Sequence, residues 1–411
     1  MNSSAINPGD TAWVLASAAL VMLMTPGLGL FYAGMVRRKN VLATILQSFI
    51  MVGIVSVQWV LFGYSLAFGP DKWHIIGGLS WIGLRGVGMA PNPDYAPTIP
   101  HEAFMIFQAM FAVITPALIT GAFAERMRFK SFFIFAILWA TLIYDPVCHW
   151  VWAPGGWLRN LGALDFAGGT VVHICSGLAA LACAITIGRR KGHGKEDMMP
   201  HNVTMTLIGA GLLWFGWFGF NAGSALAANG LAASAFVVTN TAAAAGALSW
   251  VFVETWHRGK PTALGAASGA VAGLVAITPA SGFVGPVAAI FIGGAVSLLC
   301  YGAIIMKGKL GYDDSLDVFG IHGVGGAWGA LATGLFATVL INPAGANGLF
   351  HGNPRQLLIQ LAAIGSVAAY SFIGTWLLLK ATSVFSDLRV SHEEEEIGLD
   401  ITQHGEIGYT F

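Results

Sequence analysis

The most constraining feature of this sequence is a series of long apolar segments that contain almost no charged residues. A helix needs about 20 mostly apolar residues to cross the hydrocarbon core of a bilayer. Eleven such segments can be placed along the 411 residues, beginning near positions 11, 41, 101, 131, 163, 201, 229, 262, 283, 319 and 356. The chain is therefore predicted to be a polytopic membrane protein with eleven transmembrane helices, whose boundaries carry an error of several residues.

The composition favours an all-α membrane fold. Hydrophobic residues make up 56% of the chain and charged residues only 10%, compared with about 25% charged residues in a soluble globular domain. The 54 glycines include dense runs at residues 265–273 and 322–330, and small residues allow membrane helices to pack closely. We therefore expect most of the chain to lie within the bilayer, and we expect no soluble domain.

Basic residues are distributed unevenly along the predicted spans. Sixteen of the 20 follow odd-numbered spans, at residues 37–39, 125–130, 188–195, 257–260 and 307–309 and at Lys380 and Arg389. Cytoplasmic loops carry an excess of Lys and Arg, so we predict an N-terminus outside and a C-terminus in the cytoplasm. The first ten residues contain no Lys or Arg, unlike the start of a signal peptide, and the first span is expected to remain in the protein.

Net charge and cysteine content exclude several classes of partner. The 20 basic and 20 acidic residues cancel, so no electrostatic attraction to a nucleic acid is expected. The four cysteines have no C-x-x-C spacing, which predicts neither a disulfide framework nor a thiolate metal site. We expect no cofactor.

An odd number of spans predicts a particular internal symmetry. Two halves of five spans each, at about 11–188 and 201–342, would cross the membrane in opposite directions, with an extra helix at about 356–386. Inverted repeats place a binding site at their interface near the midplane. We therefore predict a membrane domain over 1–387, with an outer loop at about 70–100, and a cytoplasmic tail over 388–411.

Two histidines lie inside apolar segments, in DFAGGTVVH, which ends at His173, and in DVFGIHGVGG, which contains His322. An ionisable group is costly in a membrane and indicates a pathway or a proton relay. We expect both imidazoles to be neutral, each with one donor and one acceptor nitrogen, and to be bonded ring to ring as mates in the inverted repeat. His322 lies close to the start of its span, so either that helix begins earlier or a broken segment precedes it.

The carboxylates Asp165 and Asp317 precede these histidines and have two interpretations. An Asp near the start of a helix accepts hydrogen bonds from free backbone N–H groups. Alternatively, Asp165 lies below an outer opening and stabilises a cation above it. The sequence leaves both interpretations open.

Aromatic residues gather near small polar residues. Phe107 and Phe111 are four residues apart and share one helix face, while Phe220 precedes Ser224 in the run FNAGS. Such rings often face lipid or the core, and Trp152 fits a membrane interface. A wall of rings followed by small polar residues is nevertheless more typical of the lining of a passage.

Several long segments resemble the ammonium transporter family (Amt, Mep and Rh proteins), and its bacterial Amt branch in particular. The resemblance covers essentially the whole chain. It is carried by residues 26–40, 107–111, 121–129, 149–156, 165–173, 216–225, 317–323 and 398–409. It implies a homotrimer with one pore per subunit and eleven helices in an inverted five-plus-five repeat, in the cytoplasmic (inner) membrane.

The resemblance also implies roles for single residues. Phe107, Trp152 and Ser224 resemble an outer site that recruits ammonium, with Asp165 as the buried acid beside it. Phe111 and Phe220 resemble a gate of stacked rings. His173 and His322 resemble the twin histidines of the pore.

The tail resembles a regulatory C-terminus that PII-type signalling proteins bind in many bacteria. Here it carries four consecutive glutamates at 393–396, and Gly408 stands where we would expect a small residue, commonly alanine. These features distinguish this tail from the usual tail of the family, and the sequence does not identify the protein that binds it.

The expected activity is ammonium transport, with methylammonium as a surrogate substrate. Removing water from a cation costs several kcal/mol, whereas a cation–π contact returns roughly 0.5 to 2 kcal/mol. Ammonium can leave its proton behind and cross as ammonia, which potassium cannot do. Whether the proton follows along the histidines is not decided by the sequence.

Three other functions are weaker expectations. An ammonium sensor that acts through its tail and a separate partner is the main alternative. A histidine-based metal transporter would need more ligands than two imidazoles, and no nucleophile–base or cofactor pattern indicates an enzyme.

Overall fold

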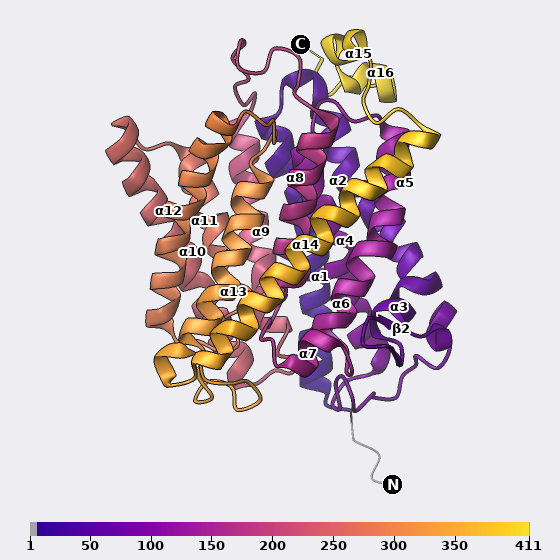
Figure 1. Cartoon of the computed structure of the whole chain (residues 1–411), viewed down its shortest axis with the longest axis vertical. Helices are drawn as coiled ribbons and strands as arrows, with labels where there is room; N and C mark the ends of the chain where they lie inside the picture. The colour runs from indigo at the N-terminus through magenta and orange to yellow at the C-terminus, as the bar shows by residue number, and fades with distance from the viewer. Residues whose placement is uncertain (1–5, 411) are drawn as a thin grey trace.

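The computed structural model describes residues 6–410 and consists almost entirely of helices (Figure 1). The first five residues and the last one, which belong to the predicted outer N-terminus and to the tail, lie outside the described residues. The elements of the first half are α1 (Pro8–Met35), η1 (Arg38–Asn40), α2 (Val41–Gln58), η2 (Trp59–Gly63), α3 (Tyr64–Phe68), β1 (Asp71–Lys72), β2 (Ile76–Gly77), η3 (Leu79–Leu84), α4 (His101–Ile119), η4 (Thr120–Ala122), α5 (Phe129–Trp139), η5 (Ala140–Tyr144), α6 (Asp145–Trp152), α7 (Trp157–Leu161), η6 (Gly169–Ile174) and α8 (Cys175–Ile187). Those of the rest are α9 (Val203–Gly223), α10 (Gly230–Arg258), α11 (Ala263–Ile277), α12 (Pro286–Leu310), η7 (Phe319–Val324), α13 (Gly325–Phe336), η8 (Leu349–His351), α14 (Pro354–Phe385), α15 (His392–Ile397) and α16 (Leu399–His404).

Nine continuous helical stretches in residues 6–410 are long and apolar enough to cross a membrane. They correspond to nine of the eleven expected segments. The segment expected near residue 262 forms α11, which has only 15 residues. The segment expected near residue 319 forms η7 and α13, which follow one another without a break but are not among the nine. The number of spans that length and hydropathy support in this part of the chain is therefore nine.

The outer loop contains the two-stranded antiparallel sheet of the described chain, in which Asp71 pairs with Gly77. The strands have two residues each and lie beside α3 and α6 at the end of the molecule where α1 starts (Figure 1). The fold of residues 6–410 is therefore all-α apart from this small hairpin.

The helix α1 starts at one end of the molecule, and the tail helices α15 and α16 lie at the other (Figure 1). Three of the predicted cytoplasmic basic clusters contact the tail there. Arg128 Nη2 lies 3.5 Å from Glu394 Oε2, Lys191 Nζ lies 2.5 Å from Glu396 Oε2, and Lys39 donates to a tail carbonyl. These clusters therefore gather on the side of the molecule that carries the C-terminus.

Hydrogen bonds between side chains and backbone N–H groups also fix the tail to the helix bundle. Asp400 accepts hydrogen bonds from Leu42 N at 3.1 Å and Ala43 N at 2.8 Å, at the start of α2. Asn40 Oδ1 accepts one from Leu399 N at 2.9 Å. An acidic side chain at the N-terminus of a helix satisfies free N–H groups and complements the helix dipole, so α16 caps α2.

The helices α1 and α9 pack closely and run antiparallel. Gly34, at the end of α1, lies against Thr206 near the start of α9, whereas Gly223, at the end of α9, lies against Ser17. A Cβ atom at Gly34 would lie 2.5 Å from the Asn202 carbonyl oxygen. The absence of side chains at these glycines permits the close approach of the two backbones.

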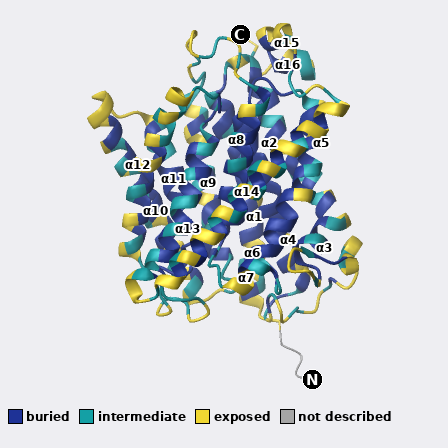
Figure 2. Ribbon diagram, viewed as in Figure 1, coloured by how far each residue is buried: buried dark blue, intermediate teal, exposed yellow. Residues whose placement is uncertain are grey.

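The interior of the bundle is buried, and the outer faces of the peripheral helices are exposed (Figure 2). On α10 and α12 the exposed positions are occupied by large apolar residues such as Phe252, Trp256 and Phe291. An apolar outer surface is the arrangement expected of helices that face lipid.

Candidate functional site

The two intramembrane histidines meet in the interior. His322 Nδ1 lies 3.2 Å from His173 Nδ1, and the ring centroids are 5.3 Å apart with nearly parallel planes. Both side chains are buried. His173 belongs to the π-helical turn η6 that leads into α8, and His322 to the π-helical turn η7 that leads into α13.

The segment that carries His173 begins later than predicted. Helix starts at Gly169 rather than near residue 163, because Gly168 has a φ of +120°, which a helix does not accommodate. His173 is therefore in the first turns of its helix. For His322 the structure selects the second alternative, since η7 begins at Phe319 after an irregular stretch in which Asp313 and Asp314 are buried.

Glycines allow the two segments to cross next to the histidines. A Cβ atom at Gly177 would lie 2.1 Å from the backbone nitrogen of Gly323. One at Gly326 would lie 2.8 Å from His173 Cβ and 3.0 Å from the Gly169 carbonyl oxygen. No side chain fits at either position, so the crossing of the backbones determines the distance between the two imidazoles.

Asp165 is the cap of η6. One of its carboxylate oxygens accepts hydrogen bonds from Gly168 N and Gly169 N, each at 2.7 Å, and the other accepts from Thr170 N at 2.7 Å and from the Thr170 hydroxyl. This geometry agrees with the first interpretation of Asp165, in which its side chain caps the helix that carries His173. The Trp152 indole N–H donates to the Asp165 carbonyl oxygen at 3.0 Å, so the cap also holds Trp152.

Of the two open interpretations, capping does not hold for Asp317. Asp314 takes that role, since its Oδ2 accepts a hydrogen bond from Phe319 N at 2.8 Å. Asp314 lies eight residues before His322, as Asp165 lies eight residues before His173. The Asp317 carboxylate instead forms an ion pair with Lys307.

A hydroxyl group sets the direction of the hydrogen bonds in the histidine pair. Thr278 Oγ1 donates to the Leu274 carbonyl at 2.8 Å, accepts from the Trp217 indole at 2.9 Å and lies 3.4 Å from His173 Nε2. Its one hydrogen is engaged, so His173 Nε2–H must donate to it. His173 Nδ1 then accepts from His322 Nδ1–H, which leaves His322 Nε2 as the free acceptor.

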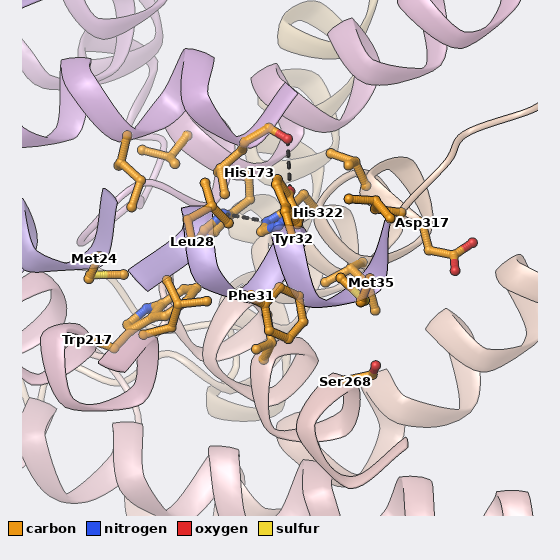
Figure 3. Close-up of a pocket in the computed structure, with 18 of the residues that line it drawn as sticks. Met24, Leu28, Phe31, Tyr32, Met35, His173, Trp217, Ser268, Asp317 and His322 are labelled. Atoms are coloured by element: carbon orange, nitrogen blue, oxygen red, sulfur yellow. Dashed lines mark hydrogen bonds between the residues drawn. The ribbon is translucent and has the colours of Figure 1, made fainter. Parts of the chain in front are cut away.

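A cavity of about 80 Å³ lies along the histidine pair and is lined mainly by apolar side chains (Figure 3). His173 and Trp217 line it on one side, and Phe31 and Tyr32 lie beside the histidines. Toward its other end Figure 3 shows Met35, Ser268 and Asp317. The polar groups are few, which makes this cavity poorly suited to hold a fully hydrated ion.

The rings of Phe111 and Phe220 lie against each other, with centroids 4.4 Å apart. Phe220 lines the cavity of the histidines, and Phe111 lines a second cavity of about 180 Å³. Trp152 meets Phe111 edge to face at 5.6 Å. The two phenylalanines therefore separate the two cavities. Following the predicted orientation, the cavity lined by Phe111 is called the outer cavity and that of the histidines the inner cavity.

The outer cavity contains only part of the predicted recruitment site. Trp152 and Ser224 line it, and the Ser224 hydroxyl donates to the Phe220 carbonyl at 2.8 Å, which leaves its oxygen free to accept. Phe107 is fully buried beside Phe111, with centroids 5.0 Å apart, and neither it nor Asp165 contributes to the described lining of the cavity.

Gln108 is a lining residue that the sequence interpretation missed. In residues 6–410 its side-chain oxygen is buried and has no hydrogen-bond partner. Gln108 stands next to Phe107 in the sequence, and an amide beside a candidate recruitment residue was a usable signal. An unpaired buried acceptor is unfavourable unless a ligand or water satisfies it, so Gln108 adds an acceptor to this cavity.

The described residues contain no group of three or more His, Cys, Asp and Glu side chains placed to hold a metal ion. The cysteines Cys148, Cys175, Cys183 and Cys300 are free and buried, with no disulfide between them. The functional groups that can contact a ligand in the two cavities are therefore ring faces, two imidazoles and a few oxygen acceptors. Long apolar helices surround two cavities that a pair of aromatic rings separates. This arrangement is typical of a membrane transport protein.

Comparison with known proteins identifies the family. The model of the Ammonium Transporter Family matches residues 12–409. The chain is 56% identical over 402 residues to an ammonium transporter from Bacillus subtilis (strain 168), with 98% of each sequence covered. This chain belongs to the ammonium transporter family.

Solved structures of related proteins have the same fold. The crystal structure of Saccharomyces cerevisiae Mep2 superposes with a TM-score of 0.91 at 37% identity, covering 98% of this chain and 92% of that one. A structure described as a Sensor Amt Protein gives a TM-score of 0.89 at 31% identity, covering 96% and 98%.

Proposed function

We propose that this protein transports ammonium across a membrane by binding the cation in the outer cavity and conducting ammonia through the inner one. The observation that carries the proposal is the position of the Phe111–Phe220 pair and of the His173–His322 pair. The phenylalanines close the path between the cavities, and the histidines follow directly, with Phe220 and His173 rings 6.1 Å apart.

The first step is recruitment of ammonium in the outer cavity. Trp152 and Phe111 offer ring faces to the cation, each such contact being worth roughly 0.5 to 2 kcal/mol. Ser224 and Gln108 offer oxygen acceptors for its N–H groups. Phe107 and Asp165 act indirectly, since Phe107 supports the Phe111 ring and Asp165 holds Trp152.

The second step is loss of the proton at the aromatic closure. A bare cation in the inner cavity would exchange its water for an apolar lining, at a cost of several kcal/mol. Neutral ammonia avoids most of this cost. It can donate a hydrogen bond to His322 Nε2, the free acceptor of the pair, and the apolar wall then discriminates against potassium, which has no proton to release.

The histidine pair offers a route for the released proton. With the tautomers assigned above, the pair accepts a proton at His322 Nε2 and releases one from His173 Nε2–H after transfer between the two Nδ1 atoms, 3.2 Å apart. Inward transfer of the released proton starts from the opposite tautomers, so both rings must exchange tautomers in each cycle. Transport along this route would carry one positive charge per ammonium, whereas ammonia alone would carry none. The sign and size of the transport current distinguish the two.

The same proposal includes the architecture of the family. Eleven spans follow if α11 and the η7–α13 unit cross the membrane with the other nine, with the N-terminus outside. The antiparallel pairs α1–α9 and η6–η7 support an inverted five-plus-five repeat. We propose a homotrimer in the inner membrane and a tail over 388–411 that responds to a PII-type protein.

Current measurements on proteoliposomes adsorbed to a solid-supported membrane test the proposal. Ammonium pulses should give a transient current or alkalinisation with the native protein. Replacing both histidines with leucine should remove selective transport, because the inner cavity then has no acceptor. Selective transport that survives this double substitution at its native rate is incompatible with the assignment.

The alternative of an ammonium sensor has one observation in its favour, the similarity to the Sensor Amt Protein. The sensor function predicts that ammonium alters the contacts of the tail without measurable flux. The same proteoliposomes therefore decide between the two functions, because a sensor gives no ammonium-dependent current or change of internal pH.

A further inference from the structure

A histidine and a carboxylate join the outer hairpin of β1 and β2 to the helix that carries Trp152. His149 lies in α6, three residues before Trp152, and Asp71 lies in β1. His149 Nε2 is 2.9 Å from Asp71 Oδ1, and His149 Nδ1 is 2.9 Å from the Ala67 carbonyl oxygen. The His149 side chain is completely buried, whereas that of Asp71 is 23% exposed.

Both atoms that face the His149 ring are hydrogen-bond acceptors. A backbone carbonyl oxygen and a carboxylate oxygen carry no hydrogen, and a neutral imidazole has a single N–H group. A neutral His149 would therefore leave two acceptors facing each other at 2.9 Å on one side of the ring. The pair of His149 and Asp71 thus holds one additional proton. Because an imidazole is a stronger base than a carboxylate, His149 is the cation and donates from both nitrogens.

Asp71 is the charged partner of this ring. The helix α6 packs against α3, η5, α7, β2 and η6. The other titratable groups on α6 and on these elements are Tyr64, Tyr144, Asp145, Cys148, Arg159 and His173. Asp145 accepts a hydrogen bond from Gln58 Nε2 at 2.8 Å, and Arg159 donates to a backbone carbonyl oxygen. The charge of His149 is therefore balanced by the hairpin.

Further contacts dock the hairpin on the corner between α6 and α7. His74 Nδ1 donates to the Gly155 carbonyl oxygen at 2.6 Å and lies 3.2 Å from Asp71 Oδ2. The Trp157 N–H donates to the His74 carbonyl oxygen at 3.1 Å. A Cβ atom at Gly155 would lie 2.7 Å from Asp71 Cβ, so the two segments are in direct contact. The hairpin and the corner therefore form one unit, and Trp152 lies within it.

We propose that His149 and Asp71 are positioning residues for the recruitment of ammonium, because the proton that they hold keeps the hairpin on α6 and thereby fixes the Trp152 ring. The inference rests on the proposed function, in which that ring binds the cation. Without the proton or the carboxylate, buried acceptors or donors lose their partners. The hairpin then separates from the corner, and the Trp152 ring loses its position.

Two substitutions of Asp71 distinguish the role of charge from that of shape. Asp71→Asn keeps the network without the additional proton, because the amide N–H can donate to a neutral His149 while the amide oxygen accepts from His74. Asp71→Ala removes both bonds. His351, an exposed residue in the loop between α13 and α14, gives the control variant His351→Ala.

Nuclear magnetic resonance of purified protein with ¹⁵N-labelled histidine and tryptophan measures the proton and the ring position. At neutral pH both nitrogens of native His149 should carry hydrogen, whereas Asp71→Asn should leave only Nδ1 protonated. The Trp152 indole hydrogen, which is bonded to the Asp165 carbonyl, should be protected from exchange in native protein and in Asp71→Asn. Asp71→Ala should lose that protection. Spectra of His149→Gln and Trp152→Leu identify the signals.

Currents after ammonium pulses measure the consequence for recruitment. Asp71→Ala should raise the half-saturating ammonium concentration about two- to thirtyfold, the range that one cation–π contact covers. Its maximal current per folded molecule should be unchanged, because the histidine cavity is not altered. Asp71→Asn and His351→Ala should keep the native half-saturation. If Asp71→Ala does not fold, Asp71→Ser takes its place with the same expectations.

A native His149 with a single N–H would overturn the inference, as would native half-saturation in Asp71→Ala. An Asp71→Asn variant that behaves like Asp71→Ala would show that the amide cannot replace the charged pair, and would also contradict it. Failure of the proposed function looks different, because the native protein then gives no current. The resonance experiment still decides in that case, since an indole that stays protected in Asp71→Ala excludes the positioning role.

Discussion

At the scale of single residues, the site depends on how a small number of polar atoms are paired. Thr278 has one hydroxyl hydrogen, and the Leu274 carbonyl takes it. This hydrogen bond to the Leu274 carbonyl determines which nitrogen of each histidine carries a proton. The Thr278 hydroxyl thereby sets the direction of the hydrogen bonds in the histidine pair.

Replacing Thr278 by valine should remove this selection. In native protein with ¹⁵N-labelled histidine, nuclear magnetic resonance should find His173 protonated at Nε2 and His322 at Nδ1. Thr278→Val should give a mixture of both tautomers in each ring, because the acceptor for His173 Nε2–H is lost. Thr278→Ser should restore the native pattern. A native spectrum with the opposite tautomers, or a valine variant that keeps the native spectrum, would contradict the assignment.

The sequence predicted the intramembrane histidines better than the residues that cap their helices or line the cavities beside them. His173 and His322 are conspicuous because imidazoles are rare in apolar segments. Capping by Asp317 was one open interpretation because DVFGIHG resembles DFAGGTVVH, but the eight-residue spacing to the histidine points to Asp314. Gln108 was missed although it adjoins Phe107 in the sequence, because only the structure shows that its buried side-chain oxygen has no partner among the described residues.

At the scale of elements, the important feature is the crossing of two helices that both begin inside the bundle. The segments η6–α8 and η7–α13 start next to each other and run in opposite directions. Their closest approach occurs at Gly177 and Gly323, within a few residues of each histidine. The crossing therefore couples the packing of two helices to the geometry of the site.

Gly177→Ala should disrupt this crossing, since the new methyl group would meet the Gly323 nitrogen at 2.1 Å. We expect a loss of about 1 to 3 kcal/mol in stability from overpacking and, in the protein that folds, reduced transport per molecule. Thermal unfolding in detergent and transport by the folded fraction measure both effects.

Gly211→Ala in α9 is the matched control, because no neighbouring atom lies within 4 Å of its added methyl group. An alanine stabilises a helix interior by roughly 1 kcal/mol relative to glycine, so this variant should be at least as stable as the native protein. If both variants behave alike, the glycine crossing does not control the site.

Hydropathy predicted where helices lie but not where they are interrupted. Average hydropathy does not mark the late start of η6, which Gly168 and the Asp165 cap determine. The short α11 was also expected at full length. Element boundaries depend on backbone angles and capping contacts, and average hydrophobicity reports neither.

At the scale of the whole molecule, charge is concentrated at the end that carries the tail. Glu125 is buried and binds Arg37 at 2.8 Å and Arg190 at 3.3 Å, while Arg190 also binds Asp313 at 2.9 Å. These residues belong to four connecting segments that are distant in the sequence. The ion network therefore ties both halves of the chain together.

The network predicts loss of stability in acid. Burial alone would raise the pKa of Glu125, but Arg190 and Arg37 outweigh it and hold that pKa below its ordinary 4.5. Burial also opposes ionisation of Asp313, but Arg190 and Arg126 hold its pKa well below the ordinary 3.8. Because the folded pKa values are depressed, the contribution to stability is present above the ordinary values and is lost as the pH falls through the folded ones.

Thermal unfolding between pH 7 and pH 3 should therefore show a steep decline below about pH 4.5. Glu125→Gln should lower stability at pH 7, since it leaves two arginines without their partner, and should make the decline shallower. A variant with an unchanged pH profile would indicate that Glu125 adds nothing to the stability of the folded state.

The general architecture could be predicted from the sequence because length, hydropathy and charge asymmetry are properties of whole segments. The gathering of basic clusters 37–39, 125–130 and 188–195 around the C-terminal end agrees with the predicted distribution. The ion pairs within that end could not be predicted, because they join loops whose distance depends on the packing of all the helices.

The closed phenylalanine pair has an electrical consequence. The rings of Phe111 and Phe220 separate the two cavities, and the cavity beside the histidines has a mainly apolar lining. In the proposed transport, a large share of the transmembrane voltage therefore drops across these rings and this apolar space. Any charge that moves through this thin layer senses that voltage, whereas an uncharged molecule does not. The voltage dependence of uptake is therefore a direct report of what crosses between those two rings.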